Sequence, residues 1–520
     1  MNPSALVPLV VILPLLGAAL ALVFTRRRRL QIIVSIVTLV AVFVVAALML
    51  WIVDVGDMPL AVSVADWPLP FGIVLYVDRL SALLVAVSSI VLLAVLLFSV
   101  GQGAADGDDD TPVSIFFPSY LILGAGIFDA FIAGDLFNMY VGFEILLVAS
   151  FVLITLGGTA PRIRTGVVYI VVSLVSSVLF LAAIAMIYGA VGTVNMVQIG
   201  ERMALIPQET QLILHLMLLV AFGIKAAVFP VSFWLPDSYP TAPAPVTAVF
   251  AGLLTKVGVY AMIRTETQLF ANDSINLVLG IVAAATLLVG ILGAVAQAEL
   301  KRILSFTLVS HVGYMVFGLS IGTAVGYGAT VYYTVHHIVV QTTLFLAVGL
   351  IERRAGSTSI LKVSGLMKAA PLLAILYFIP AINLGGLPPF SGFLGKYALF
   401  SAAAEVGTPI MWVLIVIGVI TSLLTLYALM RAWNLAFWRE DAEAPDTESR
   451  LGHLGSAPAA DEESERRAIP RIMTWATGGM VVVTLCLTAF AGPLFALADR
   501  IGDSLVEPVH LEQLEREVDG

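Results

Sequence analysis

Long apolar runs, separated by short polar clusters, follow one another along the whole chain. Each run has about 18 or more apolar residues, which as a helix would cross about 30 Å of hydrocarbon. The segment at 369–405 is too long for one straight helix, and NLGGLPPFSG interrupts it. The pattern predicts about 14 membrane-spanning helices, near 4–24, 30–53, 79–100, 114–134, 136–156, 165–189, 209–234, 241–263, 274–297, 302–321, 326–350, 369–405, 409–432 and 471–497.

Composition agrees with this pattern. Of the 520 residues, 60% are hydrophobic and only 12% are charged, and the mean hydropathy is +1.02. Soluble domains carry about 25% charged residues. We therefore expect an all-α polytopic membrane protein that lies in the lipid bilayer.

Several classes of function are excluded by composition. The net charge of −9 and the lack of a basic stripe argue against nucleic-acid binding. The single cysteine, Cys486, excludes an internal disulfide and a cysteine metal cluster. No glycine-rich phosphate loop follows a strand pattern. We expect no cofactor and no bound metal.

The distribution of positive charge predicts the topology. RRRR at Arg26–Arg29 follows the first apolar run instead of preceding it, so that run does not read as a signal peptide. Most of the 26 Lys and Arg fall in the odd-numbered connections between helices, whereas Arg264 falls in an expected outer loop. Because cytoplasmic loops are enriched in positive charge, we expect a multi-pass protein of the cell (plasma) membrane with both termini on the outer side.

Residues that are unusual in membrane helices recur at matching positions and indicate two repeats of five helices, at 114–263 and 274–432. In each group the fourth helix is interrupted by proline and carries a lysine, Lys225 before Pro230 and Lys396 after the Pro-Pro pair. Five is an odd number, so the repeats would cross the membrane in opposite directions, as in many ion-coupled transporters. The remaining parts are helices 1–3 (1–113), a flexible cytoplasmic loop (433–470), and a C-terminal helix and tail (471–520).

Titratable residues in the predicted helices are the candidates for function. An ionised side chain at the centre of a helix costs about 2.5–3.5 kcal/mol on insertion scales. One glutamate cannot neutralise three lysines, and a buried lysine without a counter-ion gives up its proton readily. We therefore predict a proton relay, formed by Glu144, Lys225, Lys256, His311, His336, His337 and Lys396.

Simpler readings of some residues stay open. A single Lys–Glu pair could only hold two helices together, and a lone histidine such as His337 often satisfies a backbone carbonyl. Asp135 precedes LFNMYV and is best interpreted as a helix N-cap. The HH pair is a poor metal site, because adjacent residues point about 100° apart on a helix.

Five long motifs occur in order: DLFNMYVGFEILLVAS, GIKAAVFPVSFWLPDSYPTAPAPVTAVFAGLLTKVGVYA, SHVGYM, HHIVVQTTLFL and GLPPFSGFLGK. With them, residues 70–435 resemble the antiporter-like subunits shared by respiratory complex I, membrane-bound hydrogenases and Mrp-type antiporters. FNMYVGFEILL and the lysine at Lys396 make the chain most similar to the D subunits (the MrpD or MnhD type) of the Mrp-type multisubunit cation/proton antiporters.

The resemblance implies a proton-translocating subunit, not an enzyme, that works with other antiporter subunits and exchanges protons for sodium or another monovalent cation. It implies that Glu144 and Lys225 form a switching pair, that Lys256 and the histidines carry protons, and that Lys396 ends the path. Relatives often have a further lysine where this chain has Gln341, so water would make part of that link.

Two alternatives remain at this stage. The chain could be a proton-pumping subunit of a complex I-type oxidoreductase or a hydrogenase, and neighbouring genes would distinguish that case. It could also be a structural subunit whose buried charges only fix assembly. Neutral substitutions of the lysines would then harm assembly and not transport.

Overall fold

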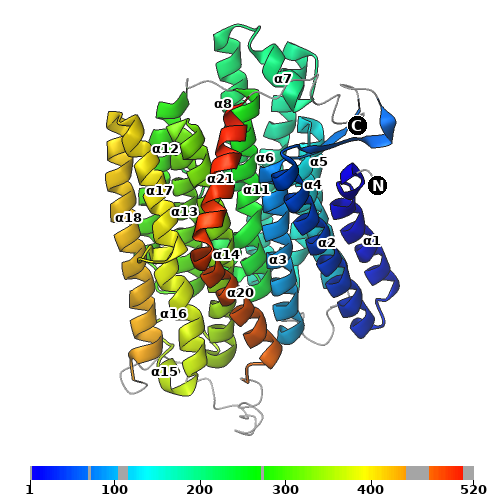
Figure 1. Ribbon diagram of the computed structural model, residues 1–520. Coiled ribbons are helices and arrows are strands. Elements are labelled where there is room, and N and C mark those ends of the chain that lie inside the picture. The colour runs from blue at the N-terminus through cyan, green and yellow to red at the C-terminus, as the bar shows by residue number, and fades with distance from the viewer. Residues whose placement is uncertain (1–2, 68–71, 104–114, 271–274, 441–467, 508–520) are drawn as a thin grey trace.

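The computed structural model is a bundle of long helices and describes residues 3–67, 72–103, 115–270, 275–440 and 468–507 (Figure 1). Within these ranges 12 helices are long and apolar enough to cross a membrane, and two shorter apolar helices, Phe116–Ile132 and Pro371–Gly385, lie where further spans are expected. The chain is a multi-pass membrane protein. The exact number of spans stays a prediction.

The helices and strands fall as follows, in chain order: η1 (Pro3–Leu6), α1 (Leu9–Val23), α2 (Arg28–Gly56), β1 (Leu60–Ser63), η2 (Val64–Asp66), β2 (Val74–Val77), α3 (Arg79–Gln102), α4 (Phe116–Ile132), α5 (Leu136–Thr155), α6 (Ala160–Val191), α7 (Met196–Met203), α8 (Gln208–Ala226), α9 (Leu235–Ser238), η4 (Tyr239–Thr241), α10 (Ala244–Val249), η5 (Phe250–Leu254), α11 (Thr255–Arg264), η6 (Thr265–Leu269), α12 (Asn276–Val295), α13 (Leu300–Ile321), α14 (Ala324–Ala355), α15 (Leu366–Ala369), α16 (Pro371–Gly385), α17 (Ser391–Val406), α18 (Pro409–Trp433), η8 (Asn434–Trp438), α20 (Arg471–Ala489) and α21 (Ala491–Val506).

The predicted helices are present, with three differences. The segment expected at 209–234 ends at Ala226. The last expected helix, 471–497, is divided at Phe490 into α20 and α21, which continues to Val506. A two-stranded antiparallel sheet, β1 with β2, joins α2 to α3 and was not expected, because its strands are only four residues long. Of the predicted loop at 433–470, residues 441–467 lie outside the described residues.

Both expected helix breaks are present, and each lies next to a buried lysine. After α8, Ala227 takes a left-handed conformation (φ 59°), and the amide of Val228 bonds back to Gly223 O (2.9 Å). After α16, Gly386 is left-handed (φ 82°) and the amide of Leu387 bonds back to Ile382 O (3.1 Å). Such helix ends leave carbonyls without a helical partner, which gives nearby cations an acceptor.

Helix α14 forms the centre of the bundle. Every residue from Gly326 to Ile351 of this 32-residue helix is buried, as expected for a helix that is apolar on every side. Thr323 caps its start by accepting from Gly326 N (3.1 Å), and left-handed Gly356 ends it. The C-terminal helix α21 packs along α14 (Figure 1). A Cβ at Gly502 would lie 2.2 Å from Ala324 O, so the close approach of these two helices requires glycine.

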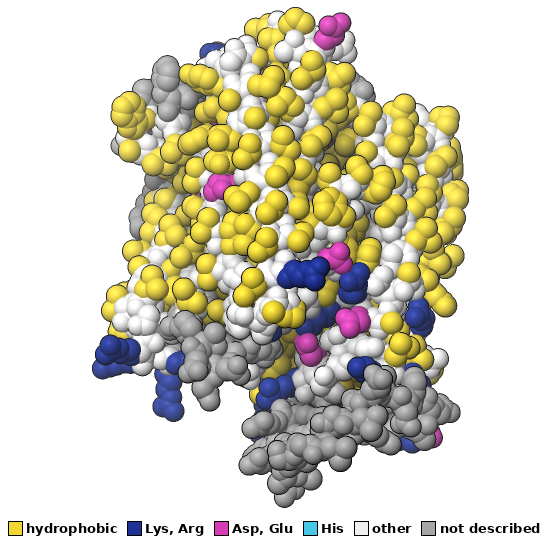
Figure 2. All heavy atoms as spheres, turned by 180° about the vertical axis from the view of Figure 1, so that it is seen from behind, with side chains coloured by type: hydrophobic (Ala, Val, Ile, Leu, Met, Phe, Trp, Pro, Cys, Tyr) yellow, Lys and Arg dark blue, Asp and Glu magenta, His cyan; other side chains and the backbone are white. Residues whose placement is uncertain are grey.

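Charge gathers at the ends of the molecule. The face in Figure 2 is mostly hydrophobic along its height, and most of its Lys and Arg lie towards the lower end. The start of α1 and the end of α21 both lie towards the other end of the bundle (Figure 1). A hydrophobic band with a basic end is the expected surface of a multi-pass protein.

Candidate functional site

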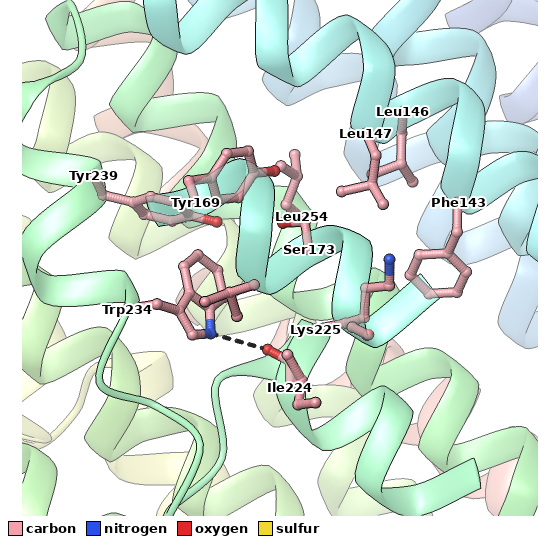
Figure 3. A pocket seen from close by; sticks show the side chains of 12 residues that line it. Phe143, Leu146, Leu147, Tyr169, Ser173, Ile224, Lys225, Trp234, Tyr239 and Leu254 are labelled. Atoms are coloured by element: carbon pink, nitrogen blue, oxygen red, sulfur yellow. Dashed lines mark hydrogen bonds between the residues drawn. The ribbon is translucent and has the colours of Figure 1, made fainter. Parts of the chain in front are cut away.

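Lys225 lies in the last turn of α8 and is 8% exposed. Its Nζ donates to Ser177 Oγ on α6 (2.9 Å) and lies 5.3 Å from the ring centre of Phe143. The side chain extends towards Phe143, beside a small cavity lined by Tyr169, Tyr239 and others (Figure 3). Both contacts are uncharged, so no carboxylate of the described residues touches this lysine.

Glu144 lies one residue after Phe143 on α5 and is partly exposed. Its Oε1 is buried and has no hydrogen-bond partner among the described residues. Glu144 is within electrostatic range of Lys225, but no ion pair within 4 Å joins the two in the described part of the chain. The two residues of the predicted pair are therefore close to each other but do not form an ion pair in this structure.

Lys256 is completely buried in α11, directly after the π-helical turn η5. Its Nζ donates to the carbonyl of Ala251 (2.6 Å). A Cβ at Gly258 would lie 2.8 Å from Ala226 N, so α11 passes very close to the end of α8. Lys225 and Lys256 flank this crossing without a hydrogen bond between them in the described residues.

The three predicted histidines form a cluster with two tyrosines. His311 on α13 shares a hydrogen bond of 2.7 Å with Tyr333 OH, and its ring stacks on that of His337 at 5.3 Å between centres. His336 Nδ1 shares a bond of 2.9 Å with Ser391 Oγ. All three histidines are fully buried. Neither ring nitrogen of His337 has a hydrogen-bond partner among the described residues, so both are free to hold water or a proton.

Lys396 lies in α17, just after the second helix break, and is 3% exposed. Its Nζ donates to Leu384 O (2.9 Å), one of the last carbonyls of α16, and to Ser422 Oγ (3.0 Å). It also lies 5.3 Å from the ring centre of Tyr314, which is 5.2 Å from the ring of Tyr333. The broken helix thus supplies the acceptor that this lysine needs.

The helices that carry most of the predicted residues pack side by side (Figure 1). Helix α8 packs on α11, α11 on α14 and α14 on α13, and α17 packs on both α13 and α14. His337 is at the centre of the row. It is within electrostatic range of Lys256, His311, His336 and Lys396. Gln341, one turn further along α14, donates to Leu304 O (2.7 Å) and leaves its own Oε1 without a partner in the described residues. The arrangement can pass protons between neighbouring groups if water bridges the gaps.

Comparison with known proteins identifies the family. A sequence model of the family described as NADH:quinone oxidoreductase/Mrp antiporter, TM, matches residues 133–425. The D subunit of the Na(+)/H(+) antiporter of Alkalihalophilus pseudofirmus is 35% identical, and the match covers 99% of this chain and 100% of that protein. The chain belongs to this family. Another member, the D subunit of the Na(+)/H(+) antiporter of Bacillus subtilis, is 34% identical over 88% of this chain and 92% of its own length.

Two solved structures have a similar fold. A chain of the Mrp complex from a Dietzia species has 30% identity and a TM-score of 0.88, with 100% of this chain and 99% of that chain covered. A chain of the membrane-bound sulfane sulfur reductase, an archaeal respiratory complex, has 23% identity and a TM-score of 0.84, and it shares the fold. The curated relatives are named as antiporter subunits and not as enzymes.

The structure contains a buried pair of titratable residues that the sequence analysis did not predict. His215 on α8 and Glu266 on η6 share a bond of 2.7 Å between Nε2 and Oε1, and both side chains are almost fully buried. The ring of Phe270 stacks on His215 at 4.3 Å. Glu266 follows an expected helix end, in RTETQ, where hydropathy places polar residues at a surface, whereas His215 lies inside an expected helix, in LILHLMLL, and was missed.

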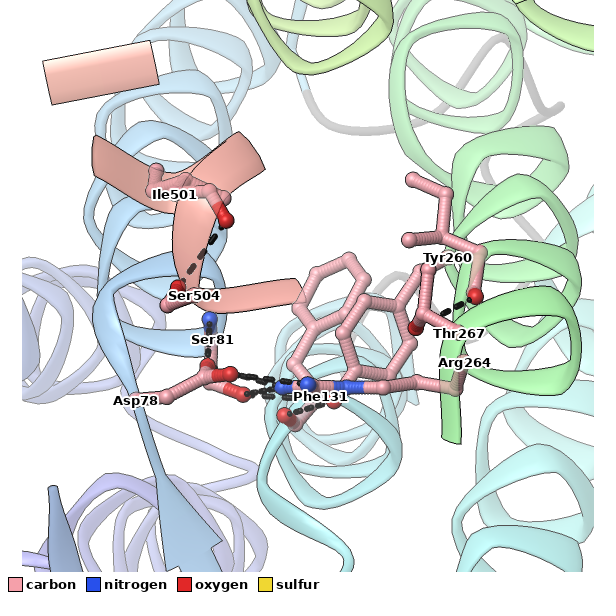
Figure 4. Close-up of polar contacts among 9 residues, drawn as sticks. Asp78, Ser81, Phe131, Tyr260, Arg264, Thr267, Ile501 and Ser504 are labelled. Carbon is pink, nitrogen blue, oxygen red and sulfur yellow. Dashed lines mark hydrogen bonds and ion pairs between the residues drawn. The ribbon is translucent and has the colours of Figure 1, made fainter. Parts of the chain in front are cut away.

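Arg264 was expected in an outer loop, but it lies in α11 and is 2% exposed (Figure 4). Its guanidinium forms two contacts of 2.7 Å with Asp78 and donates to Ser81 Oγ (3.0 Å) and Tyr260 OH (3.0 Å). Burial raises the pKa of Asp78, but the charge and hydrogen bonds of Arg264 outweigh this, so the pKa lies below its usual value. This ion pair ties α11 to the start of α3.

Other polar residues have structural roles. Asp135 accepts from Asn138 N (2.7 Å) and caps α5, as predicted. Within the described residues, no group of three or more His, Cys, Asp or Glu is placed to hold a metal ion.

Proposed function

We propose that this chain is the proton-translocating subunit of a multisubunit Mrp-type antiporter, which exchanges protons for sodium or another monovalent cation across the cell (plasma) membrane. Its partners would be the other subunits of that complex. The observation that carries the proposal is the set of buried lysines Lys225, Lys256 and Lys396, whose ammonium groups contact only hydroxyls, carbonyls and aromatic rings within the described residues. Groups held in this way can gain and lose protons without breaking an ion pair.

The proposed path begins at Glu144 and Lys225, continues through Lys256 and the histidines, and ends at Lys396. At an effective dielectric constant of about 20, a carboxylate about 4 Å from an ammonium stabilises it by about 4 kcal/mol. A movement of a few ångströms that brings Glu144 to Lys225, or separates them, would therefore decide whether the lysine keeps its proton. The unpartnered nitrogens of His337 support a water-bridged step at the centre.

The two groups of helices, 114–263 and 274–432, are proposed to be inverted repeats that each move protons through half of the membrane. The support is the matching position of Lys225 and Lys396 beside a helix end with a left-handed residue. Both termini are proposed to face outwards. The support is that the start of α1 and the end of α21 lie towards the end opposite to most of the Lys and Arg on the face in Figure 2.

The test uses the assembled complex in membrane vesicles with a pH-sensitive dye. We expect Lys225→Ala or Glu144→Ala to abolish sodium-driven proton movement, because the first group of the relay is lost. Lys368→Ala is the matched control, since Lys368 is exposed and pairs with Glu440 at the surface (3.2 Å). Exchange at the wild-type rate in assembled Lys225→Ala complexes would contradict the relay.

The alternative is a proton-pumping subunit of a complex I-type oxidoreductase, which belongs to the same family. The names of the curated relatives favour the antiporter. Purification of the native complex separates the two, because an oxidoreductase would bring iron–sulfur or quinone-binding subunits with it.

A further inference from the structure

His336 on α14 contacts the second helix break. Its ring Nδ1 shares a hydrogen bond of 2.9 Å with the hydroxyl of Ser391, the first residue of α17. Its Nε2 is buried and has no hydrogen-bond partner among the described residues. Adjacent residues point about 100° apart on a helix, so His336 reaches α17 whereas His337 stacks on α13. His336 thus joins the histidine cluster to the helix that carries Lys396.

Neighbouring helices cap the start of α17. The first amides of a helix have no partner inside the helix. Here the amide of Ser391 donates to Thr488 Oγ1 on α20 (3.0 Å), and the amide of Gly392 donates to Asn383 Oδ1 on α16 (2.8 Å). Because these caps come from other helices, the hydroxyl of Ser391 is not used as a cap and bonds to the ring of His336 instead.

Asn383 holds this hydroxyl from the other side and is fully buried. Ser391 Oγ donates to Asn383 Oδ1 (3.3 Å), and Asn383 Nδ2 lies 3.2 Å from the same hydroxyl oxygen. The bond from Gly392 N fixes the orientation of the amide, since an amide nitrogen could not accept it. A short chain of hydrogen bonds therefore runs from His336 Nδ1 through the Ser391 hydroxyl to Asn383 Oδ1.

This chain decides whether His336 can hold a second proton. A protonated imidazole carries a hydrogen on both nitrogens, so Nδ1 must then donate to Ser391. The serine oxygen can accept that bond only when its own hydrogen points elsewhere. Within the described residues, the acceptor for that hydrogen is Asn383 Oδ1.

The charged groups around the cluster do not supply this stabilisation. The titratable side chains in electrostatic range within the cluster are bases from α11, α13, α14 and α17: Lys256, His311, His337 and Lys396. The ring of Tyr333 is 5.5 Å from that of His336. Helices α16 and α20, which also pack on α14, carry no charged residue in 371–385 and 472–489. On α21, Asp499 lies beside Gly328, about two turns along α14 from His336. The dipoles of Ser391 and Asn383 are therefore the contacts that favour a charged ring.

We propose that Ser391 and Asn383 are positioning residues of the relay, which keep one proton of His336 on Nδ1 and leave Nε2 as the atom that gains and loses a proton. The proposal rests on the proposed function. In this step a protonated water beside Nε2 gives up one proton and becomes neutral water, and the lone pair of Nε2 takes that proton. Release reverses the step at the same atom. The hydrogen on Nδ1 stays bonded to Ser391, and no group is oxidised or reduced.

The experiment measures sodium-driven proton movement by the assembled complex in vesicles over a range of pH. Ser391→Ala removes the group that accepts from Nδ1. We expect exchange to fall at least about tenfold at alkaline pH, and the pH of half-maximal exchange to move about one unit towards acid. The reason is that a lost hydrogen bond to a charged group lowers proton affinity about tenfold or more. Ser391→Thr keeps the hydroxyl and should restore the wild-type profile.

Thr488→Val is the matched control. It removes the cap on the amide of Ser391 but leaves the bond between the Ser391 hydroxyl and His336. We therefore expect a lower unfolding temperature of the complex and an unchanged pH profile of exchange.

Complex yield is measured for each variant, and Asn383→Leu replaces Ser391→Ala if the latter does not assemble. Asn383→Leu should give the same shift towards acid, whereas Asn383→Asp keeps the acceptor and should not. A wild-type pH profile in Ser391→Ala or Asn383→Leu, with Lys225→Ala inactive, would overturn the positioning role and leave the relay intact. A loss that is equal at all pH values would overturn it too, because a purely structural role predicts that result. Wild-type exchange in Lys225→Ala would instead overturn the relay itself.

Discussion

Within the described residues, the three buried lysines that we propose for the relay contact dipoles and not opposite charges. Lys256 and Lys396 donate to backbone carbonyls, and Lys225 donates to a serine hydroxyl. A fixed carboxylate would hold each proton tightly through a full opposite charge, whereas a carbonyl or hydroxyl offers only a dipole. Arg264, which is paired with Asp78, shows the opposite arrangement in the same protein. The hydrogen-bond partner thus distinguishes Arg264, a structural cation paired with a carboxylate, from the lysines that we propose to exchange protons.

At the residue scale, the first prediction concerns His337. Because its ring makes no hydrogen bond within the described residues, His337→Phe should keep the packing and the stability of the complex within about 1 kcal/mol. It removes a proton carrier, so we expect exchange to fall by at least about tenfold. Dye-based exchange and thermal unfolding measure the two effects. Normal exchange in this variant would place the proton path elsewhere.

His311→Phe provides the comparison for that experiment. This change also removes the bond to Tyr333. We therefore expect a loss of stability in addition to the loss of exchange. Equal stability of the two variants would argue against a structural role for that bond.

A second prediction at this scale concerns Asp78. Its folded-state pKa is lowered, so its stabilising effect is complete above the usual pKa of 3.8 and is lost as the pH falls through the folded value. Asp78→Ala leaves Arg264 buried and unpaired, which should cost about 3 kcal/mol. The difference in unfolding temperature from wild type should stay constant between about pH 5 and pH 9. A difference that changes within this range would mean that another group titrates with the pair.

At the element scale, the two broken helices and the strap formed by α20 and α21 decide the architecture. The helix breaks place carbonyls and lysines together in the interior, which a continuous helix could not do. The strap covers α14 and closes the second half of the bundle. Its fit depends on Gly502 and Gly328, whose added Cβ atoms would meet the backbone of the facing helix at 2.2 Å and 2.9 Å.

The prediction at this scale is that Gly502→Val loosens the strap. Overpacking of this kind costs about 1–3 kcal/mol, so we expect less assembled complex and a lower unfolding temperature. Gly492→Val is the matched control on the same helix, because a Cβ there would meet no atom within 4 Å. Equal yields of the two variants would show that α21 can shift away from α14 without loss.

At the scale of the whole molecule, one face of α5 requires a covering partner. Phe137 and Val148 are 46% and 59% exposed, and Val141 and Glu144 between them are partly exposed. These positions form one helical stripe, so Glu144 opens onto the membrane-facing surface of this chain. Because a carboxylate is costly against lipid, we expect another subunit to cover this stripe.

Photo-crosslinking tests this expectation. A photoreactive residue in place of Val148 should join this chain to another subunit in the assembled complex. The same variant produced without the other subunits is the control and should give no such product. Absence of the crosslink from active complexes would mean that the stripe faces lipid and that Glu144 is protected in another way.

Much of this protein was determined by the sequence alone. Apolar runs define the helices because hydrocarbon leaves a backbone no other partners, and each lysine or histidine within them is conspicuous because its burial is costly. The proline positions likewise predicted both breaks. Glu266 and Arg264 escaped this reasoning, because they lie near expected helix ends where polar residues are ordinary, whereas His215 lies inside an apolar run and was missed.

Only the tertiary structure decided which of these groups meet. Hydropathy places Lys225 and Glu144 in the membrane, but their separation depends on how α5, α6 and α8 pack, and Ser177 takes the position of the expected partner. The stacking of His311 on His337 and the lining of the small cavity beside Lys225 also bring together elements far apart in the chain. Burial is a property of single segments that composition records, whereas contacts of a few ångströms depend on close packing between segments, which no local pattern encodes.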